Sequence, residues 1–87
     1  MRDVLCVDDE HDNLIVFEAT FEQDFRIWPV TSARAALELL EQRAFPVVVA
    51  DQRMPEMTGS HLFEIMRRKY PHTKRIMLTG YADPKAM

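Results

Sequence analysis

The sequence predicts an α/β fold in which one parallel β-sheet carries helices on both faces. Short apolar runs of strand length alternate along the chain with longer segments whose apolar residues recur every three or four positions. The runs at 4–7 and 47–50 are apolar without alternation, as in strands that are buried on both faces. The expected element order is βαβαβαβ followed by the start of one more helix, which implies right-handed crossovers and a parallel sheet.

Residues 3–7 are predicted to form the first strand, which ends at the acidic turn Asp8-Asp9-Glu10. Asp12 or Asn13 can cap the following helix, which we expect to end near residue 23 or 24. Apolar positions at a spacing of three or four are expected to face the sheet: Leu14, Phe17, Phe21 and, next in the same spacing, Phe25.

A second strand is predicted over residues 26–31, at a sheet edge, because Pro29 cannot donate to a ladder. Ser32 is a good N-cap for the second helix. That helix has the cleanest apolar stripe in the chain: Ala33, Ala36, Leu37, Leu40 and Ala44. Residues 45–50 are expected to form the central strand, which Asp51 closes.

A third helix is predicted to begin at Gly59 or Ser60 and to stop before Pro71. Its inward positions are Leu62, Phe63, Met66 and Tyr70. A fourth strand is predicted over residues 75–78, and Asp83-Pro84 has the composition of a helix start.

Composition excludes several classes of function. The 87 residues suffice for one small domain, and a net charge of −3 gives no electrostatic reason to expect nucleic-acid binding. Cys6, the only cysteine, lies in an apolar run and is interpreted as a small buried hydrophobe. No apolar run approaches membrane-spanning length and no signal core precedes the first strand, so we expect a cytoplasmic protein that does not bind membranes.

Carboxylates follow the first and third strands: Asp8 and Asp9 after one, Asp51 after the other. The carboxyl ends of neighbouring parallel strands share one edge of the sheet, where open α/β sheets bind ligands. Like charges this close cannot all stay ionised unless a cation joins them. Oxygen-only ligation suits Mg²⁺ or Mn²⁺, and the scattered histidines do not form a zinc ligand set.

A carboxylate beside a divalent cation can attack phosphorus, because the metal neutralises charge on the incoming phosphoryl oxygens. The hydroxyl of Thr79, at the end of the fourth strand, could donate to such an oxygen, and Gly80 leaves the approach open. A single strand-end Asp is usually a turn or cap residue. Combined with Met-Pro-x-Met-x-Gly at 54–59 and the strand-end Thr-Gly, the constellation is specific.

At these residues the chain resembles the receiver domain of bacterial two-component response regulators, and the resemblance covers essentially the whole chain. The matching pieces are Val7-Asp8-Asp9-Glu10, Asp51-x-x-Met54-Pro55-x-Met57-x-Gly59 and Leu78-Thr79-Gly80-Tyr81. The resemblance implies a flavodoxin-like, doubly wound parallel sheet of strand order 2-1-3-4. Asp51-Gln52-Arg53-Met54-Pro55 with Leu78-Thr79-Gly80-Tyr81 is similar to receivers of transcriptional activators and cyclic-dinucleotide phosphodiesterases.

The resemblance also implies roles for individual residues. Asp51 would accept the phosphoryl group, Asp9 would bind the metal directly, and Asp8 would assist, through water. The backbone carbonyl of Arg53 would complete the protein ligands. Thr79 would be the switch hydroxyl, and the tuning positions would be Arg53, Gly80 and Tyr81.

The implied function is a phosphoacceptor module that takes a phosphoryl group from a histidine kinase or phosphotransfer protein and switches an output domain outside this chain. It would not be an enzyme beyond its own phosphorylation and dephosphorylation. One alternative is an interaction or dimerisation module that works without phosphorylation. Another is a small Mg²⁺-dependent phosphohydrolase, for which no residue is obviously placed as general acid.

The family pattern continues past this sequence. Residues 1–87 would be an incomplete receiver domain that lacks most of helix 4, strand 5 with its Lys-Pro, and helix 5. Without them, the backbone edge of residues 75–79 and apolar surface on one sheet face would be uncovered. We therefore expect the chain to pair with a second copy, and the parent protein to continue past Met87.

Overall fold

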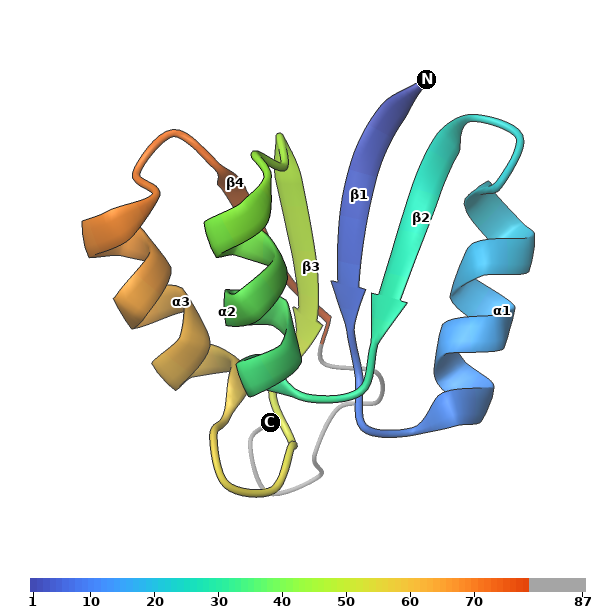
Figure 1. Ribbon diagram of the computed structural model, residues 1–87. Coiled ribbons are helices and arrows are strands. Elements are labelled where there is room, and N and C mark those ends of the chain that lie inside the picture. Colours follow the sequence, from blue (N-terminus) through green and yellow to red (C-terminus); the bar gives the residue numbers. More distant parts are fainter. Residues whose placement is uncertain (79–87) are drawn as a thin grey trace.

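The computed structural model describes residues 1–78 and shows a four-stranded parallel sheet with helices on both faces (Figure 1). The elements are β1 (Arg2–Val7), α1 (His11–Phe21), β2 (Phe25–Val30), α2 (Ala33–Gln42), β3 (Val47–Asp51), α3 (Gly59–Lys69) and β4 (Lys74–Leu78). The predicted fold class is confirmed. Strand boundaries differ from the expected ones by one or two residues, the usual uncertainty at element ends.

The strand order is β2-β1-β3-β4, so the first strand lies between the second and the third. Val7, the last residue of β1, is opposite Val30 on one side and Ala50 on the other. Asp51 is opposite Leu78 of β4. The C-terminal ends of all four strands therefore lie at the same edge of the sheet. The expected edge position of Pro29 is also observed, because among residues 1–78 only β1 pairs with β2.

The two faces of the sheet are covered by different helices. One buried cluster packs side chains of β1 and β3 against α2 and α3, with Leu5, Val48, Leu62 and Met66 at its centre. The second cluster joins Val4, Cys6 and Val49 to Leu14 of α1. Successive strand residues point to opposite faces, which explains why the runs are apolar without alternation.

The start of α1 differs from the prediction. The N-cap is Glu10, which makes no side-chain capping bond, and both Asp12 and Asn13 lie inside the helix. The Asn13 amide instead donates to Oδ2 of Asp8 at 3.2 Å, and the backbone N–H of Glu10 donates to Oδ1 at 2.9 Å. The carboxylate of Asp8 therefore fixes the turn into α1, where a cap by Asp12 or Asn13 was expected.

The end of α1 also comes earlier than expected, at Phe21. The ring centroids of Phe17 and Phe21 are 4.8 Å apart, and those of Phe21 and Phe25 are 6.5 Å apart. This row of aromatic rings fixes the helix end against the start of β2. Ile15 and Val16, on the other side of the helix, are 54% and 64% exposed.

The cap of α2 and the first residue of α3 agree with the prediction. Ser32 Oγ accepts a hydrogen bond from Ala35 N at 3.1 Å. Helix α3 begins at Gly59, and Thr58 Oγ1 accepts from His61 N at 3.2 Å. The expected position of Ala44 on the α2 stripe is wrong, because α2 ends at Gln42 and Ala44 is exposed.

None of the helices in the described part of the chain combines the length and the apolarity that a bilayer span requires.

Candidate functional site

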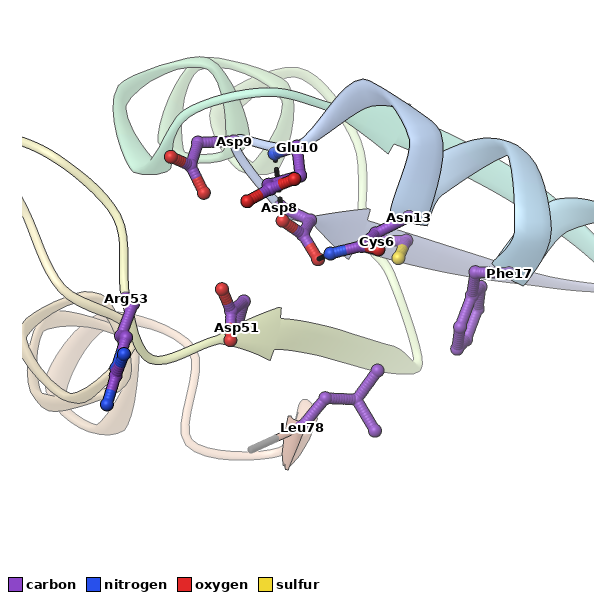
Figure 2. Close-up of a pocket in the computed structure, with 9 residues that line it drawn as sticks. All are labelled: Cys6, Asp8, Asp9, Glu10, Asn13, Phe17, Asp51, Arg53 and Leu78. Atoms are coloured by element: carbon purple, nitrogen blue, oxygen red, sulfur yellow. Dashed lines mark hydrogen bonds between the residues drawn. The ribbon is translucent and has the colours of Figure 1, made fainter. Parts of the chain in front are cut away.

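Three carboxylates lie together at the edge of the sheet where the strands have their C-terminal ends, next to β1 and β3. Each of Asp8, Asp9 and Asp51 offers an oxygen, and these oxygens all lie within 4.8 Å of one another. Figure 2 shows the three side chains gathered at one end of a cavity. The register of β1 and β3 explains this, since Val7 and Ala50 are partners and each strand continues into an aspartate.

Asp8 is held in a single orientation by its neighbours. It is 8% exposed, and each of its two carboxylate oxygens accepts one hydrogen bond from the turn that leads into α1. A carboxylate oxygen accepts more than one hydrogen bond, so both oxygens keep capacity for a metal ion or a water. The contribution of Asn13 to this arrangement was missed in the sequence, where its spacing suggested a helix cap.

Asp51 is half-buried at the end of β3. Burial raises the pKa of its carboxyl, and the charge of Asp8 raises that pKa further, while Asp9 has the smallest effect. Hydrogen bonds from the backbone N–H groups of Gln52 and Arg53 oppose the shift. Burial and the neighbouring carboxylates thus disfavour the ionised form of Asp51, and a bound cation would favour it.

The donor set fits a hard divalent cation. All three side chains offer carboxylate oxygen, the ligand that Mg²⁺ and Mn²⁺ prefer. Cys6 lines the same cavity, but burial, with a smaller effect from Asp8, raises the pKa of its thiol to about 12. The thiol therefore stays protonated at neutral pH and does not offer the thiolate that soft metals require.

The cavity has a volume of about 360 Å³ and two chemically distinct ends. The three aspartates, with Glu10, Asn13 and Arg53, line the polar end. Cys6, Phe17 and Leu78 line the apolar end, between α1 and the outer strand β4 (Figure 2). The polar end is open to solvent, because Asp9, Glu10 and Arg53 are exposed.

The loop after β3 returns to the sheet at Gly59. A Cβ atom at this position would lie 2.5 Å from the carbonyl oxygen of Asp51 and 2.9 Å from Sδ of Met77. The N–H of Gly59 donates to the carbonyl of Gln52 at 3.2 Å. Helix α3 therefore begins in direct contact with the backbone of Asp51, which only glycine permits.

Three of the expected site residues lie outside the described residues: Thr79, Gly80 and Tyr81. Arg53 is exposed and lines the cavity. The structure therefore brings together the three aspartates, and the roles of all these residues in phosphoryl transfer stay predictions.

Comparison with known proteins identifies the family. The model of the response regulator receiver domain matches residues 4–87. The chain belongs to the response regulator receiver family. The resemblance noted in the sequence is thereby confirmed, and the receiver is a signalling module.

Named relatives of this receiver are larger proteins. The hydrogenase transcriptional regulatory protein HoxA of Cupriavidus necator is 38% identical over 80 residues, which are 92% of this chain and 17% of HoxA. A probable cyclic di-GMP phosphodiesterase of Vibrio cholerae is 35% identical over 85 residues, 94% of this chain and 19% of the relative. The chain thus spans less than a fifth of either protein. Both relatives agree with the similarity expected from the motifs.

Solved receivers share the fold. The chemotaxis protein CheY4 of Vibrio cholerae superposes with a TM-score of 0.87 at 28% identity, over 99% of this chain and 74% of the other. The response regulator TrrA of Thermotoga maritima, solved in complex with Mg²⁺-BeF, has a TM-score of 0.88 at 26% identity, over 94% and 72%. These two structures support the flavodoxin-like strand order β2-β1-β3-β4 of this chain.

Proposed function

We propose that this receiver accepts a phosphoryl group on Asp51 and thereby switches an output domain outside this chain. The observation that carries the proposal is the convergence of three carboxylates within 4.8 Å. Asp8, Asp9 and Asp51, with the backbone carbonyl of Arg53, would hold Mg²⁺ or Mn²⁺. The solved TrrA receiver in complex with Mg²⁺-BeF supports this choice of ion.

The proposed step is an in-line transfer to a carboxylate. One oxygen of the ionised Asp51 attacks phosphorus, the new O–P bond forms, and the P–N bond to the donor histidine breaks. The imidazole nitrogen keeps the electron pair of the broken bond and takes up a proton. When bound, the divalent cation neutralises charge on the phosphoryl oxygens.

The residues around Asp51 prepare it for this step. The N–H groups of Gln52 and Arg53 orient its carboxylate and favour the ionised form that attacks. Asp8 is held by Glu10 N and Asn13, beside the carboxylates of Asp9 and Asp51 (Figure 2). Water reaches the site through the open cavity, which suits an acyl phosphate that is hydrolysed again.

The further roles extend the same proposal. Thr79 would donate its hydroxyl to the phosphoryl group and transmit the change, and the tuning positions would be Arg53, Gly80 and Tyr81. The phosphoryl donor would be a histidine kinase or a phosphotransfer protein, and the setting the cytoplasm. Turnover would be limited to phosphorylation and dephosphorylation of Asp51, without another substrate.

One observation favours the second candidate, an interaction module that pairs with another copy without phosphorylation. Ile76 and Leu78 of the outer strand β4 are 40% and 39% exposed and lie on the same face of the strand. Exposed apolar residues on an edge strand favour pairing with another chain. Sedimentation at several concentrations tests this, because a monomer throughout would exclude it.

Phosphorylation can be tested directly. The chain is incubated with acetyl phosphate and Mg²⁺, and intact mass followed by peptide mapping locates the added phosphoryl group. We expect one group on Asp51, none in Asp51→Asn, and none when a chelator removes the metal. Unmodified wild-type protein under conditions that phosphorylate a known receiver would contradict the proposal and favour the interaction module.

A further inference from the structure

We propose that Gln52 is a positioning residue, which holds the Asp51 carboxylate and the loop after it by tying both to the first turn of α3. The proposal rests on the proposed function of Asp51. It adds a residue that does not line the cavity and whose side chain bonds to Ser60.

The first observation is the bonding of the Gln52 side chain. Its Oε1 accepts two hydrogen bonds from Ser60, one from the backbone N–H and one from Oγ, each at 2.7 Å. An amide oxygen has two lone pairs, so both are used. The backbone carbonyl of Gln52 accepts a third bond from Gly59 N at 3.2 Å. The first two residues of α3 thus direct three hydrogen bonds to one residue, which closes the base of the loop 53–58.

The second observation lies on the opposite side of Gln52. The backbone N–H groups of Gln52 and Arg53 face the carboxylate of Asp51 closely enough to lower its pKa. The Arg53 N–H and the Gln52 carbonyl belong to the same planar peptide group. That plane therefore has its N–H beside the Asp51 carboxylate, while its carbonyl accepts the 3.2 Å hydrogen bond from Gly59 N. A rotation of the plane would weaken the bond from Gly59 and move the Arg53 N–H relative to the carboxylate, which links the position of α3 to the orientation of Asp51.

The third observation concerns how closely α3 approaches the strand. A Cβ at Gly59 would lie 2.5 Å from the Asp51 carbonyl oxygen, so the start of α3 packs directly against the end of β3. The bonds from Gln52 prevent it from moving away. Inside the closed loop, Glu56 has a φ of 71°, a strained backbone conformation for a residue with a side chain. A strained loop keeps its shape only when its ends are held.

An ordinary helix cap is the simpler explanation of the Gln52 side chain, and the structure provides a comparison for it. Helix α3 already has an N-cap, because Thr58 Oγ1 accepts from His61 N. Thr58 thus caps the same helix without the contacts that Gln52 makes. If Gln52 only stabilised α3, replacing either residue would have the same consequences for the site.

The test compares Gln52→Ala and the similar-sized Gln52→Met with Thr58→Ala as the matched control. Mg²⁺ affinity is measured by calorimetry, and amide exchange at Gln52 and Arg53 is measured by NMR in metal-free protein. We expect both Gln52 variants to bind Mg²⁺ roughly tenfold more weakly than wild type. This is the lower end of the loss in metal affinity seen when a residue that orients a metal ligand is replaced. The same variants should exchange these two amides faster, while Thr58→Ala keeps both properties near wild type. Ser60→Ala, which loses one of the two bonds, should fall between them.

Two results would overturn the proposal. One is an equal loss of Mg²⁺ affinity in Thr58→Ala and Gln52→Ala, and the other is unchanged amide exchange in both Gln52 variants. If wild-type protein binds no Mg²⁺, the proposed function fails, and the exchange rates in metal-free protein still decide the role of Gln52. If Gln52→Ala does not fold, Gln52→Met and Ser60→Ala provide the same comparison.

Discussion

The contact between Gly59 and Asp51 makes the sharpest prediction about this fold. In Gly59→Ala, the new methyl group would lie 2.5 Å from the carbonyl oxygen of Asp51 and 3.1 Å from its carbonyl carbon. Sδ of Met77, at 2.9 Å, can move with its flexible side chain, whereas the Asp51 backbone is fixed in the sheet. The substitution must therefore displace the start of α3 from the strand.

Two opposing effects determine the size of the change. Forcing an extra methyl group into a closely packed region costs about 1–3 kcal/mol. Alanine recovers up to about 1 kcal/mol because it favours the helix more than glycine. The expected net loss is about 1–2 kcal/mol, which lowers Tm by roughly 5–15 °C in a domain of this size.

Urea unfolding monitored by circular dichroism measures this loss. Repeating the substitution in a Met77→Ala background removes the contact with sulfur and leaves the contact with the Asp51 carbonyl. We expect Gly59→Ala to remain destabilising there, by a smaller amount. A Gly59→Ala protein as stable as wild type would show that α3 does not pack against Asp51 as described.

Three further predictions concern other parts of the chain. The folded state raises the pKa of Asp51, so ionisation of this carboxyl destabilises the fold. This destabilisation is absent below the ordinary pKa of 3.8 and grows as the pH rises through the folded-state pKa. Metal-free Asp51→Asn should therefore melt higher than wild type at neutral pH, a difference that disappears in acid; equal melting at both would contradict it. Glu56→Gly should relieve the strained φ of 71° and stabilise the fold by roughly 0.5 kcal/mol. The control Glu38→Gly, within α2, should destabilise the fold by about 1 kcal/mol, and urea unfolding measures both changes. Asp3→Ala should cost about 1–3 kcal/mol and shift Trp28 fluorescence, because Trp28 Nε1 (3.2 Å) and Arg43 Nη2 (2.9 Å) both donate to Asp3; unchanged emission and stability would refute this.

The site could be predicted from the sequence because its geometry follows from strand polarity. Once residues 4–7 and 47–50 are recognised as neighbouring parallel strands, Asp8 and Asp51 must share an edge. The helices could be predicted equally well where their apolar residues are regularly spaced, as at Ala36 and Leu40. These features depend on local pattern and on one rule of topology.

The errors have a different origin, namely contacts between residues far apart in sequence. The α2 stripe was extended to Ala44, but Arg43 leaves the helix, pairs with Asp3 at 2.9 Å and stacks over Trp28 at 4.2 Å from the ring centroid. Periodicity contains no information about that cluster.

The cap of α1 was misplaced for a similar reason. Asn13 bonds to Asp8 instead of to the helix start, so a favourable local choice was overridden by the site. The bonds between Gln52 and Ser60 also escaped notice, since no local pattern marks them.

The most direct test of the central claim is a Mg²⁺ titration of the metal-free chain, with carboxyl carbons observed by NMR. We expect one ion to bind per chain and to shift the carboxyl signals of Asp8, Asp9 and Asp51 together, with the binding weakened in Asp9→Asn. Shifts spread over the surface carboxylates, with these three signals unchanged, would contradict the assignment of this edge of the sheet as the metal site.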